Sequence, residues 1–152
     1  MKNKSLLIQL TIFFVISLAL IILGSARNSQ SSSTDISLET RPKSDKIEIM
    51  YFHASARCAS CITLEEYLNE AVDDFFQDEI ASGKISFQKV NIDLPENKEL
   101  ANKFEAVSSS LKINEIYDGI DHIEEDVRVW RYLGDKEDFK NYLKNRIESR
   151  LN

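Results

Sequence analysis

The two cysteines of this 152-residue chain, Cys58 and Cys61, are separated by two residues. A dithiol with this spacing can form and break a disulfide, or it can supply half of the ligands of a zinc site. A zinc site would need two more ligands, and His53 and His122 are the only histidines. A purely structural disulfide is disfavoured, because closing so short a loop removes little entropy from the unfolded chain. We interpret the pair as redox-active, with metal binding and structural thiols as alternatives.

The cysteines lie where a predicted strand passes into a predicted helix. Residues 46–52, KIEIMYF, have the composition of a strand. After Cys61, apolar residues recur at helical spacing and form one face of an amphipathic helix: Leu64, Tyr67, Leu68, Ala71, Val72, Phe75 and Phe76. Cys58 should therefore lie near the first turn of this helix, where unpaired backbone N–H groups and the helix dipole favour an anion.

This position gives the two cysteines different roles. A thiolate at Cys58 would be stabilised by the helix N-terminus and by the neighbouring positive charge of Arg57. We predict that Cys58 is the nucleophile and that Cys61, one turn further along the helix, resolves the mixed disulfide.

An uncharged apolar run precedes this region. Residues 6–23 would span roughly 27 Å as a helix, close to the thickness of a bilayer's hydrocarbon core. Lys2 and Lys4 precede the run and predict a cytoplasmic N-terminus with the rest of the chain outside. The length of the run favours an uncleaved anchor over residues 1–24. The alternative is a signal peptide that is cleaved after Ala26, which would release a secreted protein.

Export by either route would place the remaining chain where disulfides are permitted. Residues 25–44 are rich in serine and predict a flexible linker to the cell membrane. Residues 45–152 predict one folded domain, with 14 Lys and Arg against 23 Asp and Glu, a net charge of −9. So acidic a domain argues against a nucleic-acid partner.

The rest of the domain predicts alternating strands and helices. Residues 84–93 and the segment around Leu111–Ile113 are predicted strands, and Pro95 suits the first turn of a short helix through Phe104. Asp118-Gly119 is a turn signal. An acidic loop at 124–126 and a strand at 127–132 should follow. A final helix is expected after an Asp135 cap, with an apolar face of Phe139, Tyr142, Leu143, Ile147 and Leu151.

Residues 45–152 resemble the thioredoxin-like superfamily. The resemblance is carried by the strand that leads into Cys58-Ala59-Ser60-Cys61, by the segment 90–101, VNIDLPENKELA, and by the close through Asp118-Gly119 to a C-terminal helix. More narrowly, the chain resembles small exported thioredoxin-like proteins that are labelled putative nitroreductase subunits and associated with arsenic-resistance genes. The resemblance implies an α/β thioredoxin-like fold, a central mixed sheet flanked by helices, protein disulfide substrates and no cofactor.

Two departures from the thioredoxin pattern concern the surroundings of the cysteines. Ser109 stands closest to the position of the usual cis-proline, and a trans bond is expected there because a cis non-proline bond costs about 2.5–4 kcal/mol. Tyr51 and Phe52 stand in the region of the usual buried acid. A proton from Cys61 must then pass to water or to another group, for which His53 and Glu65 are candidates, although each could equally be only packed or solvated.

We therefore predict an exported, membrane-tethered thiol–disulfide oxidoreductase. The acidity of the domain and the nearby Glu65 and Glu66 oppose a thiolate, which favours a reductant or isomerase over a strong oxidant. The chain holds no second cysteine pair, so a membrane electron donor is implied. The alternative is a carrier whose dithiol binds a soft metal ion such as Cu(I), or arsenite.

Overall fold

Strand β1 (Lys46–His53) lies in the middle of the sheet and is buried on both faces over most of its length. The computed structural model describes residues 42–151. Side chains alternate along β1, so that Ile47, Ile49 and Tyr51 belong to one apolar core and Met50 and Phe52 to a second. The predicted strand before the cysteines is confirmed.

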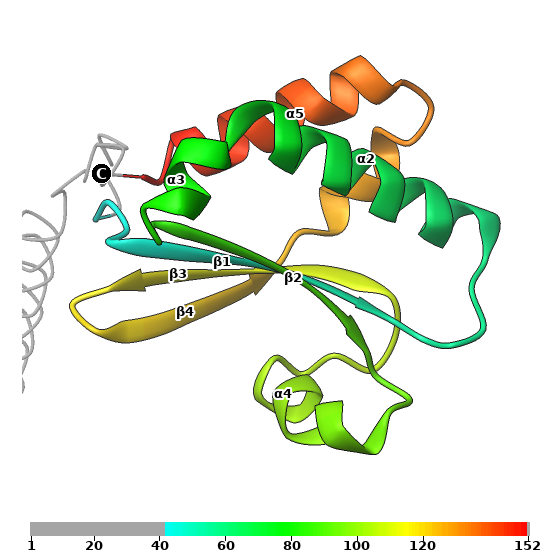
Figure 1. Cartoon of the computed structure of the whole chain (residues 1–152). Coiled ribbons are helices and arrows are strands. Elements are labelled where there is room, and N and C mark those ends of the chain that lie inside the picture. Colours follow the sequence, from blue (N-terminus) through cyan, green and yellow to red (C-terminus); the bar gives the residue numbers. More distant parts are fainter. Residues whose placement is uncertain (1–41, 152) are drawn as a thin grey trace, which may run out of the picture. The chain divides into compact units, whose positions relative to one another are not determined.

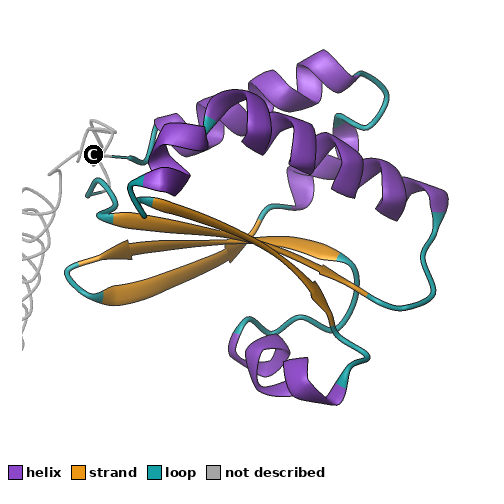
Figure 2. Ribbon diagram, in the orientation of Figure 1, coloured by secondary structure: helices purple, strands orange, loops and turns teal. Residues whose placement is uncertain are grey.

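Four strands form one mixed sheet in the order β2-β1-β3-β4 (Figures 1 and 2). The other three are β2 (Ile85–Asn91), β3 (Ser110–Tyr117) and β4 (Ile120–Glu125). Strand β2 runs parallel to β1, whereas β3 is antiparallel to β1 and β4 is antiparallel to β3. The expected α/β class with a central mixed sheet is therefore confirmed for the described residues.

Helices cover both faces of this sheet (Figure 1). On one face lie α2 (Ala59–Phe75), α3 (Gln77–Ala81) and α5 (Lys136–Glu148). On the other lies α4 (Lys98–Lys103), preceded by a 3-10 turn, η1 (Pro95–Asn97), which confirms the short helix predicted to begin at Pro95. The second core lies on this side, where the rings of Phe52 and Phe104 are 5.5 Å apart.

The segment after the cysteines, where the sequence predicts one amphipathic helix, contains two successive helices, α2 and α3. Phe76 separates α2 from α3 because its backbone, with φ −128° and ψ 19°, leaves the helical region. Its side chain is buried in the larger core, so packing holds the break in place. Amphipathic spacing continues to Phe76 and could not reveal this change of direction.

The prediction of a strand at residues 127–132 is wrong. The returning strand is β4, directly after the tight turn at Asp118 and Gly119, both of which have positive φ. Residues Val127–Arg131 instead form a 3-10 helix, η2, in which Asp126 accepts a hydrogen bond from the Arg128 backbone. Alternating apolar residues there place Val129 in the core without any strand pairing. Glu124 and Glu125, which were predicted to lie in a loop, belong to β4. Charged side chains suit this strand because it lies at the edge of the sheet.

The final helix agrees with the prediction. Asp135 caps α5 by accepting a hydrogen bond from the Asp138 backbone at 3.0 Å. Phe139, Leu143 and Ile147 are fully buried, so the predicted apolar face packs on the sheet and on α2.

A buried ion cluster joins α5 to the sheet. Glu115 on β3 is 3% exposed, and its carboxylate is 2.7 Å from Arg146 Nη1 and 2.6 Å from Arg150 Nη2. Burial alone would raise the pKa of Glu115, but hydrogen bonds from Arg150 and Arg146 outweigh it and hold that pKa below its usual range. Glu115 is therefore charged at neutral pH and balances two largely buried cations.

Glu115→Gln should lower the free energy of unfolding at pH 7 by about 3–5 kcal/mol, because Arg150 loses its buried counter-charge and Arg146 keeps only Asp126 as a buried one, at 3.8 Å. Glu124→Gln is the matched control, since the side chain of Glu124 contacts the same Arg146 but is 50% exposed. Its cost should be about 1 kcal/mol or less. Urea unfolding measures both, and equal costs would contradict the role given to Glu115.

The same cluster predicts a pH dependence. Because the pKa of Glu115 is lower in the folded protein, its stabilisation is complete above the unfolded-state value of about 4.3 and is lost as the pH falls through the folded-state value. When the pH falls from 7 to below the folded-state pKa of Glu115, the free energy of unfolding should therefore decrease more in the wild type than in Glu115→Gln.

Candidate redox site

Cys58 and Cys61 form a disulfide at the start of α2. Cys58 is the N-cap residue, with extended backbone, and its Sγ accepts a hydrogen bond from the Cys61 backbone N at 3.2 Å. Cys58 is exposed, whereas Cys61 is buried at 8% exposure. The expected place of Cys58 at the helix start is thus confirmed, and solvent reaches the two cysteines unequally.

The loop between β1 and α2 is tied to the end of β2. The Ser55 backbone N donates to Asp93 Oδ2 at 2.7 Å, and Asn91 Nδ2 donates to Ser55 Oγ at 3.0 Å. Sequence analysis did not single out these residues. Their signal is positional, because β1 and β2 are parallel and their carboxyl ends therefore meet at one edge of the sheet.

Tyr51 lies beneath the cysteine pair and is fully buried. Its hydroxyl donates to the Cys61 carbonyl oxygen at 2.7 Å and also interacts with Ser109. Burial is the main reason why the pKa of Tyr51 is raised, so the hydroxyl stays protonated and remains a donor. A neutral tyrosine therefore occupies the region where the thioredoxin pattern has an acid.

Arg57 directs its guanidinium toward this hydroxyl. Its Nη2 lies 3.3 Å from both Tyr51 Oη and the Cys61 carbonyl oxygen, and it pairs with Glu65. The positive charge expected to assist Cys58 is therefore already matched by a carboxylate. Among the described contacts of the guanidinium, none is with the Cys58 sulfur.

Glu65, on the second turn of α2, pairs with Arg57 and with Lys89 of β2, whose Nζ is 3.4 Å from Oε1. Burial alone would raise the pKa of Glu65, but these two cations outweigh it and lower that pKa. The carboxylate is thus charged at neutral pH and a weaker base than an ordinary glutamate. Lys89 was not foreseen, because only the β1–β2 pairing brings it to α2.

His53 and Ser109 both contact Tyr51, His53 from the end of β1 and Ser109 from the segment before β3. The ring of His53 stacks on Tyr51 with centroids 5.8 Å apart, and its Nδ1 lies 3.0 Å from the Ala54 carbonyl oxygen. Ser109 precedes β3, and every peptide bond between residues 42 and 151 is trans, as expected. The structure thus gathers His53, Arg57 and Ser109 around Tyr51.

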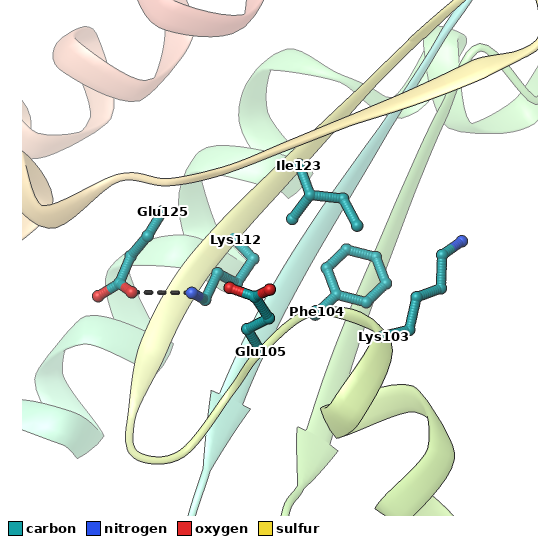
Figure 3. A pocket seen from close by; sticks show the side chains of 6 residues that line it. All are labelled: Lys103, Phe104, Glu105, Lys112, Ile123 and Glu125. Carbon is teal, nitrogen blue, oxygen red and sulfur yellow. Dashed lines mark hydrogen bonds and ion pairs between the residues drawn. The ribbon is translucent and has the colours of Figure 1, made fainter.

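His122 lies elsewhere, on β4, where its ring stacks on Tyr117 at 3.7 Å. Within residues 42–151, no group of three His, Cys, Asp or Glu side chains is arranged to hold a metal ion. A cavity of about 380 Å³ lies on the α4 side of the sheet, as Figure 3 shows, and it includes neither cysteine. Its lining residues are Lys103, Phe104, Glu105, Lys112, Ile123 and Glu125.

The structure thus has a mixed sheet with β1 in its interior, the Cys58–Cys61 disulfide at the start of the following helix, and a C-terminal hairpin and helix. This arrangement fits a thioredoxin-like fold. No protein-family model matches the chain, and no curated protein matches it.

Solved structures with similarity to the chain include three of low identity. An uncharacterised thioredoxin-like protein from Clostridium perfringens has 12% identity and a TM-score of 0.45, over 80% of this chain and 90% of that one. The germline-specific thioredoxin Deadhead from Drosophila melanogaster has 17% identity and a TM-score of 0.40, over 65% and 79%. A malarial protein has 21% identity and a TM-score of 0.36, over 53% and 81%. The comparisons give no evidence for the narrower resemblance to nitroreductase-subunit or arsenic-resistance proteins.

Tyr51→Phe should lower the free energy of unfolding of the oxidised protein by about 1 kcal/mol, because the Cys61 carbonyl loses the hydrogen bond that the Tyr51 hydroxyl donates at 2.7 Å. Tyr67→Phe is the matched control, since that ring packs against Phe139 and none of the described hydrogen bonds involves its hydroxyl. Its effect should stay within about 0.5 kcal/mol. Denaturant unfolding of both variants tests this, and an unchanged Tyr51→Phe protein would contradict it.

Proposed function

We propose that the domain is a thiol–disulfide oxidoreductase that acts on protein disulfides. The observation that carries this proposal is the unequal exposure of the disulfide-bonded cysteines: Cys58 at the helix N-cap is exposed, and Cys61 one turn later is buried. Solvent-accessible thiolates at helix N-termini are reactive, whereas buried cysteines react mainly within their own protein.

In the reduced domain, the Cys58 thiolate attacks one sulfur of a substrate disulfide. The substrate S–S bond breaks, one substrate sulfur leaves as a thiolate and takes up a proton, and a mixed disulfide forms at Cys58. Cys61 then loses its proton and attacks Cys58 Sγ, which restores the Cys58–Cys61 disulfide and releases the second substrate thiolate. The substrate gains two electrons, and the dithiol loses two.

The charges around the pair support a reductant or isomerase. Glu65 neutralises Arg57, whereas Glu66 on α2 is 59% exposed and paired with Lys136, so it contributes little to the charge at the cysteines. The reduced form thus gains little thiolate stabilisation beyond that of the helix end, which corresponds to a reduction potential below roughly −180 mV. The chain has no second cysteine pair, so a reductive cycle needs a separate electron donor, for which we propose a membrane protein.

Residues 6–23 support a tether at the cell membrane, which would hold the domain outside the cytoplasm and near a membrane electron donor. This segment lies outside the described residues. Between residues 42 and 151, no helix is sufficiently long and apolar for a membrane span.

If Cys58 is the nucleophile, it should react with an alkylating agent faster than Cys61 in the reduced protein at pH 7. Mass mapping after partial alkylation measures the ratio. Cys58→Ser should abolish reduction of insulin, whereas Cys61→Ser should accumulate a mixed disulfide with the substrate. Preferential labelling of Cys61, or tight binding of Cu(I) or arsenite without any disulfide reduction, would contradict the proposal.

If residues 6–23 remain attached as an anchor, the full-length protein should stay with membranes through a carbonate wash. Its N-terminal peptide should also be detectable by mass spectrometry. A soluble exported form that begins at Arg27 would show cleavage instead, and the redox proposal for the domain would be unaffected.

A further inference from the structure

Three charged side chains from three segments meet beside the buried cysteine. Arg57 comes from the loop before α2, Glu65 from α2 and Lys89 from β2. Their side chains are 23%, 20% and 42% exposed, so the Arg57–Glu65 pair is the more buried contact. Such a pair is costly to bury unless its geometry and hydrogen bonds are well satisfied.

The guanidinium of Arg57 is held in a specific place. Its Nη2 is 3.3 Å from the Cys61 carbonyl oxygen and 3.3 Å from Tyr51 Oη, and its Cζ lies 5.7 Å from the centroid of the Tyr51 ring. Arg57 is adjacent to Cys58 in sequence, yet these contacts lie at the carbonyl of Cys61. Glu65 completes the set of acceptors and draws the guanidinium to this side.

A guanidinium free to approach the Cys58 sulfur would stabilise the thiolate, and thiolate stabilisation favours the reduced form of the pair. Glu65 opposes this in two ways, because it neutralises the charge of Arg57 and restrains its position. Both effects depend on Arg57 being present, whereas simple repulsion between Glu65 and a thiolate does not.

We propose that Glu65 is a positioning residue that keeps the Cys58–Cys61 pair reducing by holding Arg57 at the Cys61 carbonyl. This inference rests on the proposed redox function. It gives Glu65 a role other than that of the proton acceptor considered from the sequence, and it makes Arg57 the group through which Glu65 acts.

A double-mutant cycle tests the inference, with the equilibrium between each full-length variant and graded glutathione ratios as the readout. Glu65→Gln should shift this equilibrium about tenfold toward the reduced protein, or ~30 mV upward. In the Arg57→Gln background the same substitution should shift it less than about threefold, because a coupling term is the mark of residues that act together.

Glu66→Gln is the matched control, since the side chain of Glu66 is 59% exposed and contacts Lys136 at 3.6 Å. It should leave the equilibrium unchanged in both backgrounds. A Glu65→Gln shift of equal size with and without Arg57 would overturn the inference and leave only simple charge repulsion. No shift at all would also overturn it.

Glu65→Asp provides a second test that keeps the charge. The shorter side chain should no longer hold Arg57, so the equilibrium should move in the same direction as in Glu65→Gln, and an unchanged equilibrium would overturn the inference. The pH profile of Cys58 alkylation should move to lower pH in both variants, which a loss of stability alone would not produce. Because glutathione reports the potential without a protein substrate, failure of insulin reduction would count against the proposed function and not against this coupling.

Discussion

The position of the cysteines depends on the burial of β1 on both faces. An apolar strand in the middle of a sheet has one register in which both cores are filled, because a shift by one residue would exchange its two faces. This register fixes where the chain leaves the sheet at His53, and therefore where α2 can begin. The N-cap position of Cys58 follows from that exit point, since only four residues lie between it and the end of the strand.

Tyr51 connects this apolar framework to the chemistry. Its ring belongs to the larger core, while its hydroxyl must find a partner because it is fully buried. The Cys61 carbonyl oxygen and Ser109 supply that partner from two different segments, and Arg57 approaches from a third. One buried hydroxyl thus couples the packing of the sheet to the backbone at the resolving cysteine. Changes in that packing should be felt at the disulfide.

Sequence patterns were reliable where local rules act alone. The Asp135 cap, the Asp118-Gly119 turn and the apolar face of α5 each depend on neighbouring residues, and each is present as expected. The prediction of a strand at 127–132 was wrong because alternation of apolar side chains also arises in a 3-10 segment that packs on a core. The break at Phe76 was not predicted for a related reason: the helix ends where Phe76 packs into the core, and that contact involves residues distant in the sequence.

By itself the sequence determined the cysteine pair, the strand before it, the helix after it and the position of Cys58 near the start of that helix, because these are contiguous in the chain. Only the tertiary structure decided the charge beside that dithiol. Arg57 was expected to stabilise the thiolate of its neighbour Cys58, but it is paired with Glu65. Lys89 reaches Glu65 only because β2 lies beside β1. Electrostatic partners are chosen by distance in space, and distance in space is set by which elements pack together.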